Sequence, residues 1–309
     1  MSNPNVFILG SNSAIAVQDR FPSGQVFSSQ NSHILIDCGE GTQFRMSQYK
    51  IKKSKIKAIF ITHLHGDHVF GLPGLITSYQ LAGRRAKLTI FGPKPIKEYL
   101  DLNLGGIGHF ISFPLEIIEL DEDLEKDKLH TIFEDGKITV ETFHLYHRIS
   151  CFGYKISEKS KRPKISKDFI AEHSPSIEQI NSVLQGEDFI TATGARLNNK
   201  DITVPRSLPK SYAYCSDTIF HKPLADVLKN TTCIYHESTY LEQYKEQAAE
   251  RFHSTAYQAG IIAEGASAQK LILGHYSSRY KELQPFADEA SKSFSGEIVL
   301  AKEGLSIDI

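Results

Sequence analysis

Short apolar runs that end in a polar side chain recur along the chain, separated by stretches with helical periodicity. Such alternation is typical of a layered α/β protein. The apolar runs end in side chains that can bind metals: HILIDCGEG at Asp37, AIFITHLHGDH at His63, ITVETFHLYH at His147, YAYCSD at Asp217, CIYHES at His236 and Glu237, and LILGH at His275. If the strands lie in one or two sheets that open toward a common edge, we expect these side chains to converge there.

The segment IFITHLHGDHVFGLPGL, residues 59–75, carries the densest group of such side chains. Its first residues predict the end of a buried strand. Side chains two positions apart in an extended chain point the same way, so His63 and His65 can bind one cation together. A chance match to H-x-H-x-D-H in a chain of this composition has odds of about one in a thousand. The motif therefore indicates a metal site.

The second half of the motif points to another cation. Gly66 permits a sharp turn, after which Asp67 and His68 face away from the first pair of histidines. The sequence LPGLITSYQLA, with Pro73 near its start, predicts a helix after this turn. Imidazole and carboxylate ligands together suit Zn²⁺ or a similar divalent metal.

Composition limits the class of protein. A chain of 309 residues with 40% hydrophobic residues and a net charge of -1 can bury a large core. Because no leader pattern and no apolar run of about 20 residues is present, we expect a cytoplasmic chain without a membrane span. The cysteines lie far apart without C-x-x-C spacing, which favours reduced core thiols over disulfides: Cys38, Cys151, Cys215 and Cys233.

Several histidines and one aspartate have more than one interpretation from the residues alone. His144 and His147 compete within FHLYHRISCFGY. Asp217 in CSDT can bind a metal or cap a turn. The GGIGHF stretch lacks the spacing of a nucleotide-binding loop. No metal role is assigned to the remaining isolated histidines, which are His33, His109, His130, His173 and His221.

A series of blocks, in order from about residue 6 to residue 280, resembles the ribonuclease Z family, the tRNA 3′ processing endonucleases of the metallo-β-lactamase superfamily. The blocks are LIDCGEGTQ, THLHGDH, HRISCFGY, YCSDT, HESTY, HSTAYQAG and LILGHYSSRY. The resemblance implies an α/β fold, the four-layer αββα sandwich, as a single domain over residues 1–309. It also implies a substrate-binding arm inserted at about residues 155–210.

The resemblance assigns roles to nine residues of these blocks and favours His147 over His144. It implies two Zn²⁺ ions per chain, one held by His63, His65 and His147, the other by Asp67, His68 and His275, with Asp217 between them. Asp67 would also act in catalysis, and His253 and Glu237 would transfer a proton to the leaving group. Ser238 replaces the alanine that is usual in the family.

The implied reaction is two-metal hydrolysis of a phosphodiester, because paired cations stabilise the negative charge that develops on its oxygens. The implied partner is precursor tRNA, and the family is typically homodimeric. The segment KISEKSKRPK, residues 155–164, is rich in basic residues that can contact phosphates. The arm lacks the Gly-Pro tip common in the family, and AVQDRFPSG keeps one arginine of the usual Pro-Thr-x-x-Arg-Asn pattern.

Three functions are compatible with this sequence. The first is a zinc-dependent endoribonuclease that removes 3′ trailers from precursor tRNA. The second is a related metallo-β-lactamase-fold phosphodiesterase that acts on a smaller substrate, which the altered arm would favour. The third is a catalytically silent binding protein, which the complete set of expected ligands disfavours.

Overall fold

The computed structural model of the chain describes residues 3–309 except 18, 31, 106–110, 160–162 and 205–207. His109 with most of the GGIGHF stretch, and Lys161 and Arg162 of the basic segment, lie outside the described residues. The chain divides into a larger unit, Met1–Ser157 with Lys210–Ile309, and a smaller unit, Glu158–Pro209.

The first sheet of the larger unit has seven strands in the order β18-β1-β2-β3-β4-β5-β6. Their bounds are β1 (Asn5–Gly10), β2 (Gly24–Ser29), β3 (Ser32–Ile36), β4 (Ile56–Phe60), β5 (Leu88–Pro93), β6 (Leu115–Leu120) and β18 (Ser306–Asp308). β1, β2 and β3 pair antiparallel, whereas β3, β4, β5 and β6 pair parallel.

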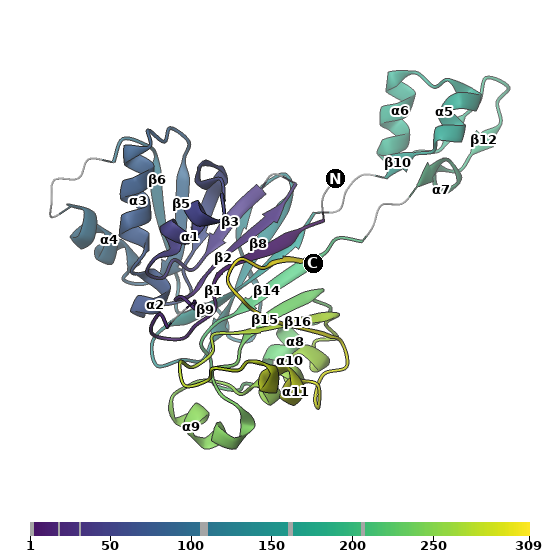
Figure 1. Ribbon diagram of the computed structural model, residues 1–309. Coiled ribbons are helices and arrows are strands. Elements are labelled where there is room, and N and C mark those ends of the chain that lie inside the picture. The colour runs from purple at the N-terminus through teal and green to yellow at the C-terminus, as the bar shows by residue number, and fades with distance from the viewer. Residues whose placement is uncertain (1–2, 18, 31, 106–110, 160–162, 205–207) are drawn as a thin grey trace. The chain divides into compact units, whose positions relative to one another are not determined.

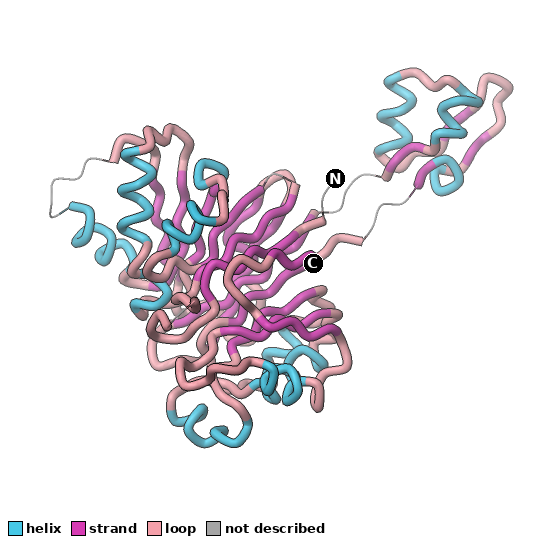
Figure 2. Tube along the Cα trace, in the orientation of Figure 1, coloured by secondary structure: helices cyan, strands magenta, loops and turns pink. Residues whose placement is uncertain are grey.

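The second sheet also has seven strands, in the order β17-β16-β15-β14-β9-β8-β7. Their bounds are β7 (His130–Glu134), β8 (Ile138–Leu145), β9 (Cys151–Glu158), β14 (Ser211–Cys215), β15 (Cys233–Glu237), β16 (Lys270–Gly274) and β17 (Glu297–Leu300). The four strands from β14 to β17 pair parallel, and β9 pairs antiparallel with β14. Figure 2 shows both sheets in magenta.

Helices lie on the outer faces of both sheets (Figure 1). Those associated with the first sheet are α1 (Thr42–Gln48), α2 (Gly66–Val69), α3 (Leu72–Leu81) and α4 (Ile96–Gly105), with the short η1 (Lys53–Lys55). Those associated with the second sheet are α8 (Leu224–Val227), α9 (Lys245–Glu250), α10 (Ala256–Gly265) and α11 (Gln284–Ala290), with η2 (Glu242–Tyr244). The predicted helix after Pro73 is α3, which carries this proline in its first turn.

Three apolar cores hold these layers together. The core between the sheets combines Phe27 and Phe60 of the first sheet with Tyr154 and Tyr212 of the second. A second core packs α1, α3 and α4 on the outer face of the first sheet, and a third packs α10 and α11 on the outer face of the second. The architecture is therefore the four-layer αββα sandwich that the sequence resemblance implies.

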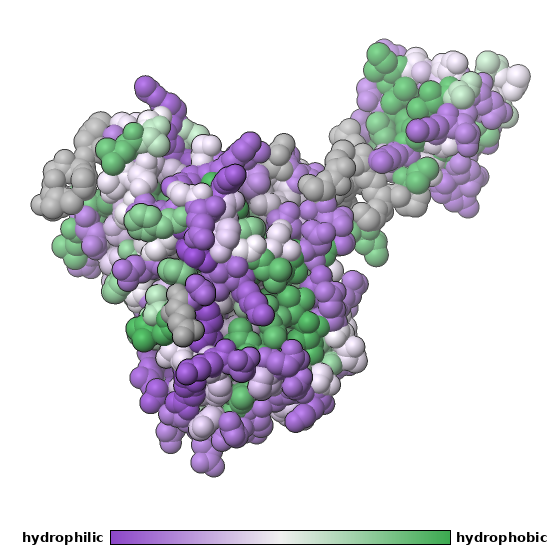
Figure 3. All heavy atoms as spheres, viewed as in Figure 1, coloured by the Kyte–Doolittle hydropathy of each residue, from purple (hydrophilic) through white to green (hydrophobic). Residues whose placement is uncertain are grey.

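The smaller unit has its own small core. Its elements are β10 (Lys164–Ile165), α5 (Lys167–His173), α6 (Ile177–Leu184), β11 (Phe189–Ile190), β12 (Arg196–Leu197), α7 (Asn199–Ile202) and β13 (Thr203–Val204). Phe169, Val183, Phe189 and Ile202 are buried together in it. Figure 3 shows hydrophobic side chains on the visible face of this unit, in line with the 78% exposure of Ile177.

The described helices include none with the length and apolar character needed to cross a membrane. All four cysteines are buried and free, as expected for core thiols. Burial raises the pKa of the Cys38, Cys215 and Cys233 thiols well above the usual range, so these side chains remain neutral.

Candidate metal centre

Parallel strand ends bring the polar side chains together. β3 and β4 are parallel neighbours, and the chain continues from them into Asp37 and His63. β14, β15 and β16 are parallel neighbours in the second sheet, and at their carboxyl ends lie Asp217, Glu237 and His275. Because parallel strands deliver their carboxyl ends to one edge of a sheet, these residues meet at one edge of the sandwich.

The H-x-H-x-D-H motif folds as an extended segment followed by one helical turn. His63 and His65 lie in the extended part, where His63 Nε2 and His65 Nδ1 are 3.1 Å apart. Gly66 begins α2, which carries the next two residues of the motif. A Cβ atom at Gly66 would lie 2.2 Å from the ring of Phe70, so a larger residue here would require this exposed ring to move.

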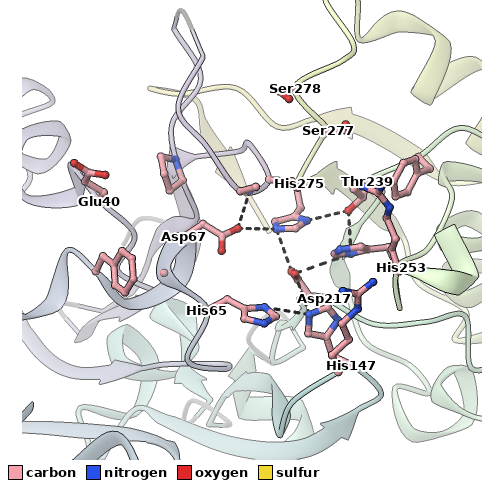
Figure 4. A pocket seen from close by; sticks show the side chains of 18 residues that line it. Glu40, His65, Asp67, His147, Asp217, Thr239, His253, His275, Ser277 and Ser278 are labelled. Carbon is pink, nitrogen blue, oxygen red and sulfur yellow. Dashed lines mark hydrogen bonds and ion pairs between the residues drawn. The ribbon is translucent and has the colours of Figure 1, made fainter. Parts of the chain in front are cut away.

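Side chains that can bind metals fall into close groups, which contain all seven residues that the sequence assigns to metals and also His253. In each group the possible ligand atoms lie within 4.8 Å of one another. The groups are His63, His65, His147 and Asp217; Asp67, His68 and His275; and Asp217, His253 and His275. Figure 4 shows His65, Asp67, His147, Asp217 and His275 turned toward a common space.

Asp217 lies between the first two groups. Its Oδ2 is 3.7 Å from His63 Nε2 and 3.8 Å from His147 Nε2. Its Oδ1 is 3.1 Å from His275 Nε2 and 3.4 Å from His68 Nε2. One oxygen therefore faces each group, which is the geometry of a carboxylate that bridges two cations.

The hydrogen bonds of the histidines fix which ring nitrogen carries the proton. His147 Nδ1 donates to the carbonyl of Phe252 at 3.0 Å, and His68 Nδ1 donates to Asp37 Oδ2 at 2.7 Å. A carbonyl and a carboxylate can only accept, so in the neutral rings both Nδ1 atoms carry the proton and both Nε2 atoms carry lone pairs.

Two threonines fix the tautomers of His63 and His275 in the same way. The hydroxyl of Thr62 donates to Asp37, so it accepts from His63 Nδ1 at 3.0 Å. The hydroxyl of Thr239 donates to Glu237 Oε2 at 2.7 Å, so it accepts from His275 Nδ1 at 2.9 Å.

When these rings are neutral, as metal binding requires, four Nε2 lone pairs face the oxygens of one carboxylate; without a cation, burial would lower the pKa of His68, but Asp67, Asp217 and Asp37 raise it. Atoms of this kind repel each other unless cations lie among them. The donor set, the tautomers and the spacing therefore fit divalent metals that prefer imidazole and carboxylate ligands, such as Zn²⁺.

Asp37 supports the centre by binding the Nδ1 atom of His68, on the side of the ring away from Asp217. It is fully buried, and its left-handed backbone (φ 56°) ends β3. Besides His68 it accepts hydrogen bonds from the Thr62 amide at 2.9 Å and from the Tyr214 hydroxyl at 3.1 Å. A carboxylate on the far nitrogen of a metal-binding imidazole orients the ring and raises its basicity.

Electrostatics keep the central carboxylates ionised. Burial alone would raise the pKa of Asp67, but His68 and His275 lower it far below its usual range. Asp217 is also buried, yet the imidazoles around it, His275 first, hold its pKa well below the usual range. Burial lowers the pKa of His63 and His147, which favours their neutral forms.

His253 and Glu237 form a separate pair beside the metal groups. His253 Nδ1 lies 2.9 Å from Glu237 Oε1, and Glu237 is fully buried. The carboxylate also accepts from the amides of Ser254 and Thr239, at 2.9 and 2.8 Å. Burial alone would lower the pKa of His253, but Glu237 and Asp217 raise it to about 8. Such an imidazole carries a proton near neutral pH and can donate it.

Several of these side chains line one cavity of about 820 Å³, namely His65, Asp67, His147, Asp217, His253 and His275. Its wall also contains two arginines, three serines, a phenylalanine and a tyrosine, namely Arg148, Arg251, Ser13, Ser277, Ser278, Phe70 and Tyr240. The cavity is large enough for a phosphodiester together with the groups on either side of it, and its arginines favour an anionic substrate.

The structure distinguishes His147 from His144, which the sequence left as alternatives. His144 Nε2 contacts the carbonyl of Leu124, whereas His147 Nε2 lies 3.2 Å from His65 Nδ1. Thr62 and Thr239 have no role in the sequence interpretation, although each sits beside a motif histidine or glutamate. Spacing does not reveal these contacts, because the direction of the Thr62 hydroxyl is set by Asp37 at the end of the neighbouring strand, and Thr239 and His275 follow different strands.

Comparisons with solved structures identify the class of fold. The metallo-beta-lactamase fold protein YhfI from Bacillus subtilis matches with a TM-score of 0.69 and 17% identity, covering 99% of each chain. Human tRNase Z, short form, matches with a TM-score of 0.69 and 23% identity, again over 99% of each chain. The chain is therefore a protein of the metallo-β-lactamase fold with a histidine-rich candidate metal centre.

Sequence relatives define the family. The protein named Ribonuclease Z from Parabacteroides distasonis is 37% identical over 313 residues, covering 100% of both chains. That from Cytophaga hutchinsonii is 38% identical over 302 residues, covering 97% of this chain and 95% of the relative. This chain belongs to the ribonuclease Z family.

A family model also matches part of the chain. It is described as Anti-Pycsar protein Apyc1 and matches residues 4–180. The matched region contains the H-x-H-x-D-H motif and His147, and it ends before Asp217, Glu237 and His275. The similarity to proteins named Ribonuclease Z covers all of these positions, because it extends over the full length.

Proposed function

We propose that the chain is a metal-dependent endoribonuclease that removes 3′ trailers from precursor tRNA. Membership of the ribonuclease Z family supports the substrate. The observation that carries the proposal is the convergence of Asp217 with both histidine groups, next to the His253–Glu237 pair, in one cavity. A binding protein without activity would not need a protonated imidazole beside such a centre.

The proposed metal centre holds two Zn²⁺ ions per chain. One set of ligands is His63, His65 and His147, the other is Asp67, His68 and His275, and Asp217 contacts both. Bound divalent cations supply Lewis-acid chemistry, since they stabilise negative charge on phosphoryl oxygens and lower the pKa of water.

The remaining chemistry belongs to side chains of this chain. The proposed role of Asp67, in addition to binding metal, is to orient the attacking water and take its proton. His253, with Nδ1 held by Glu237, then donates the Nε2 proton to the departing oxygen. The water oxygen bonds to phosphorus as the bond from phosphorus to the 3′ oxygen breaks. The products are a tRNA with a 3′ hydroxyl and a trailer with a 5′ phosphate.

We propose that the smaller unit is the arm that contacts tRNA. Within the described residues 163–204, four basic residues stand against six acidic ones, so the body of this unit carries no excess positive charge. The basic residues concentrate instead in the preceding segment 155–164. This segment is therefore the part of the arm that we expect to contact phosphates.

Replacing Lys155 and Lys164 together by alanine tests that role. Each lost phosphate contact reduces the slope of log affinity against log salt by about 0.9. We therefore expect weaker binding of precursor tRNA and a salt slope lower by about 2. The ratio of activity on precursor tRNA to activity on a small chromogenic phosphodiester should fall as well. An unchanged slope would show that these lysines do not contact the RNA.

The proposed activity itself is tested with a precursor tRNA that carries a 3′ extension. We expect one cut on the 3′ side of the nucleotide that precedes the CCA position, loss of cutting with a chelator, and recovery with Zn²⁺. Cleavage of a small phosphodiester without cleavage of precursor tRNA would favour the second candidate function. Less than one zinc per chain in a metal analysis, with no cleavage of either substrate, would favour a binding protein.

The resemblance also supports a homodimer that acts in the cytoplasm, and we propose both. Light scattering of the purified protein measures the number of subunits in solution.

A further inference from the structure

Phe252 adopts a backbone conformation that bulky residues rarely adopt. Its φ angle is 59°, in the left-handed region. In this region the Cβ atom of an L-residue approaches the following carbonyl oxygen, so glycine is favoured and asparagine is tolerated. A phenylalanine there is maintained only if the surrounding structure requires that conformation, and such residues concentrate at functional sites.

The conformation of Phe252 joins two parts of the candidate centre. Its carbonyl accepts the hydrogen bond from His147 Nδ1 at 3.0 Å. The next residue is His253, whose amide donates to the carbonyl of Ala248 at 2.8 Å and whose ring contacts Glu237. One left-handed residue therefore directs its carbonyl to a metal-site histidine and begins the segment that carries the proton donor.

The phenyl ring of Phe252, unlike its backbone carbonyl, has no described contact with the candidate centre. The side chains of Arg251 and His253 line the cavity, whereas Phe252 is not among its lining residues. Phe252 is 39% exposed, so it is not a core residue held only by packing.

We propose that Phe252 is a positioning residue whose left-handed backbone, rather than its ring, orients His147. The hydrogen bond to its carbonyl keeps the proton on His147 Nδ1, which leaves the Nε2 lone pair on the side of Asp217. If φ moved to a negative value, the carbonyl would turn away and both the ring angle and the tautomer would be lost. This inference rests on the proposed metal centre, since His147 must be a ligand for its orientation to matter.

Substitutions that differ in their tolerance of the left-handed region separate backbone from ring. Phe252→Gly, Phe252→Asn and Phe252→Ala all remove the ring and can adopt this conformation, whereas the β-branched Phe252→Val strongly resists it. We expect zinc affinity, measured by competition with a chelating dye, to stay within about threefold of the wild type for the first three. For Phe252→Val we expect a loss of about tenfold or more, the usual effect of removing a hydrogen bond that orients a ligand.

A spectroscopic readout and a matched control complete the test. With Co²⁺ in place of zinc, the visible absorption spectrum of Phe252→Val should differ from the wild type, and that of Phe252→Gly should not. Lys50 also has a left-handed backbone, at φ 57°, in the exposed turn after α1. Lys50→Val and Lys50→Gly should change thermal stability without changing zinc affinity.

Each outcome decides the inference. Equal zinc affinity in Phe252→Val and Phe252→Gly would overturn it, and so would a tenfold loss in Phe252→Gly, which would assign the role to the ring. If Phe252→Val does not fold, the smaller β-branched Phe252→Thr takes its place with the same expected loss, and the glycine and alanine variants must still keep wild-type affinity. A wild-type protein that binds no zinc would instead refute the metal centre itself.

Discussion

Cleavage of precursor tRNA is expected to fall by about a hundredfold or more in Asp67→Ala, while the chain remains folded. Asp67 Oδ2 lies 3.4 Å from His68 Nε2 and 3.5 Å from His275 Nε2. It also accepts a hydrogen bond from the Ala14 amide at 2.8 Å, which holds the carboxylate in place. Alanine removes one of the three proposed ligands of one metal and the proposed acceptor of the water proton.

The measurement is single-turnover cleavage at saturating protein, with zinc content measured on the same sample. Circular dichroism and thermal melting report on folding, and Asp101→Ala, which removes an exposed carboxylate from α4, is the matched control. We expect the control to cleave like the wild type. If Asp67→Ala retained more than about a tenth of the wild-type rate, Asp67 would have neither proposed role.

The α/β class and the structure around the metal motif can be predicted from local patterns, whereas the four-layer fold and the full ligand set come from the family resemblance, and the ligand set stays a prediction. The H-x-H-x-D-H motif, the strand before it and the helix after Pro73 occupy a continuous stretch, so spacing alone indicates their structure. Strand ends such as those before Asp217 and His275 are also visible as apolar runs that stop at a polar residue. Parallel pairing then converts these separate ends into one site.

Other features depend on contacts between neighbouring strands of one sheet, which spacing does not encode. Thr62 accepts from His63 because its hydroxyl donates to Asp37 at the end of the adjacent strand β3, and Thr239, after β15, contacts His275 after the adjacent strand β16. The left-handed backbone of Phe252 is equally hidden, because the residue type argues against that conformation. In the proposed role of Phe252, functional constraint overrides local preference at this position.

The supporting roles in the centre follow one rule. Asp37 contacts His68, Thr239 contacts His275, and the Phe252 carbonyl contacts His147, each at Nδ1. In all three cases the Nε2 atom is left free to face Asp217. Three unrelated groups therefore select the same tautomer. Histidines that bind metals through Nε2 require this tautomer, and random packing of histidines would not produce it.

His253→Ala is expected to slow cleavage of precursor tRNA by about a hundredfold to ten-thousandfold, the usual contribution of a general acid. Glu237→Gln should cause a smaller loss, because glutamine keeps the shape but removes the charge that raises the pKa of His253 to about 8. KM should change little in either variant, since neither side chain is a proposed contact of the arm with tRNA.

The double variant separates a joint role from two independent ones. If Glu237 acts only through His253, then His253→Ala with Glu237→Gln should be no slower than His253→Ala alone. A phosphodiester with a p-nitrophenolate leaving group needs little protonation, so its hydrolysis should lose much less in His253→Ala than cleavage of precursor tRNA does. Equal losses on both substrates would mean that His253 supports the metal centre rather than the leaving group. Zinc content would then be expected to fall in the same variant.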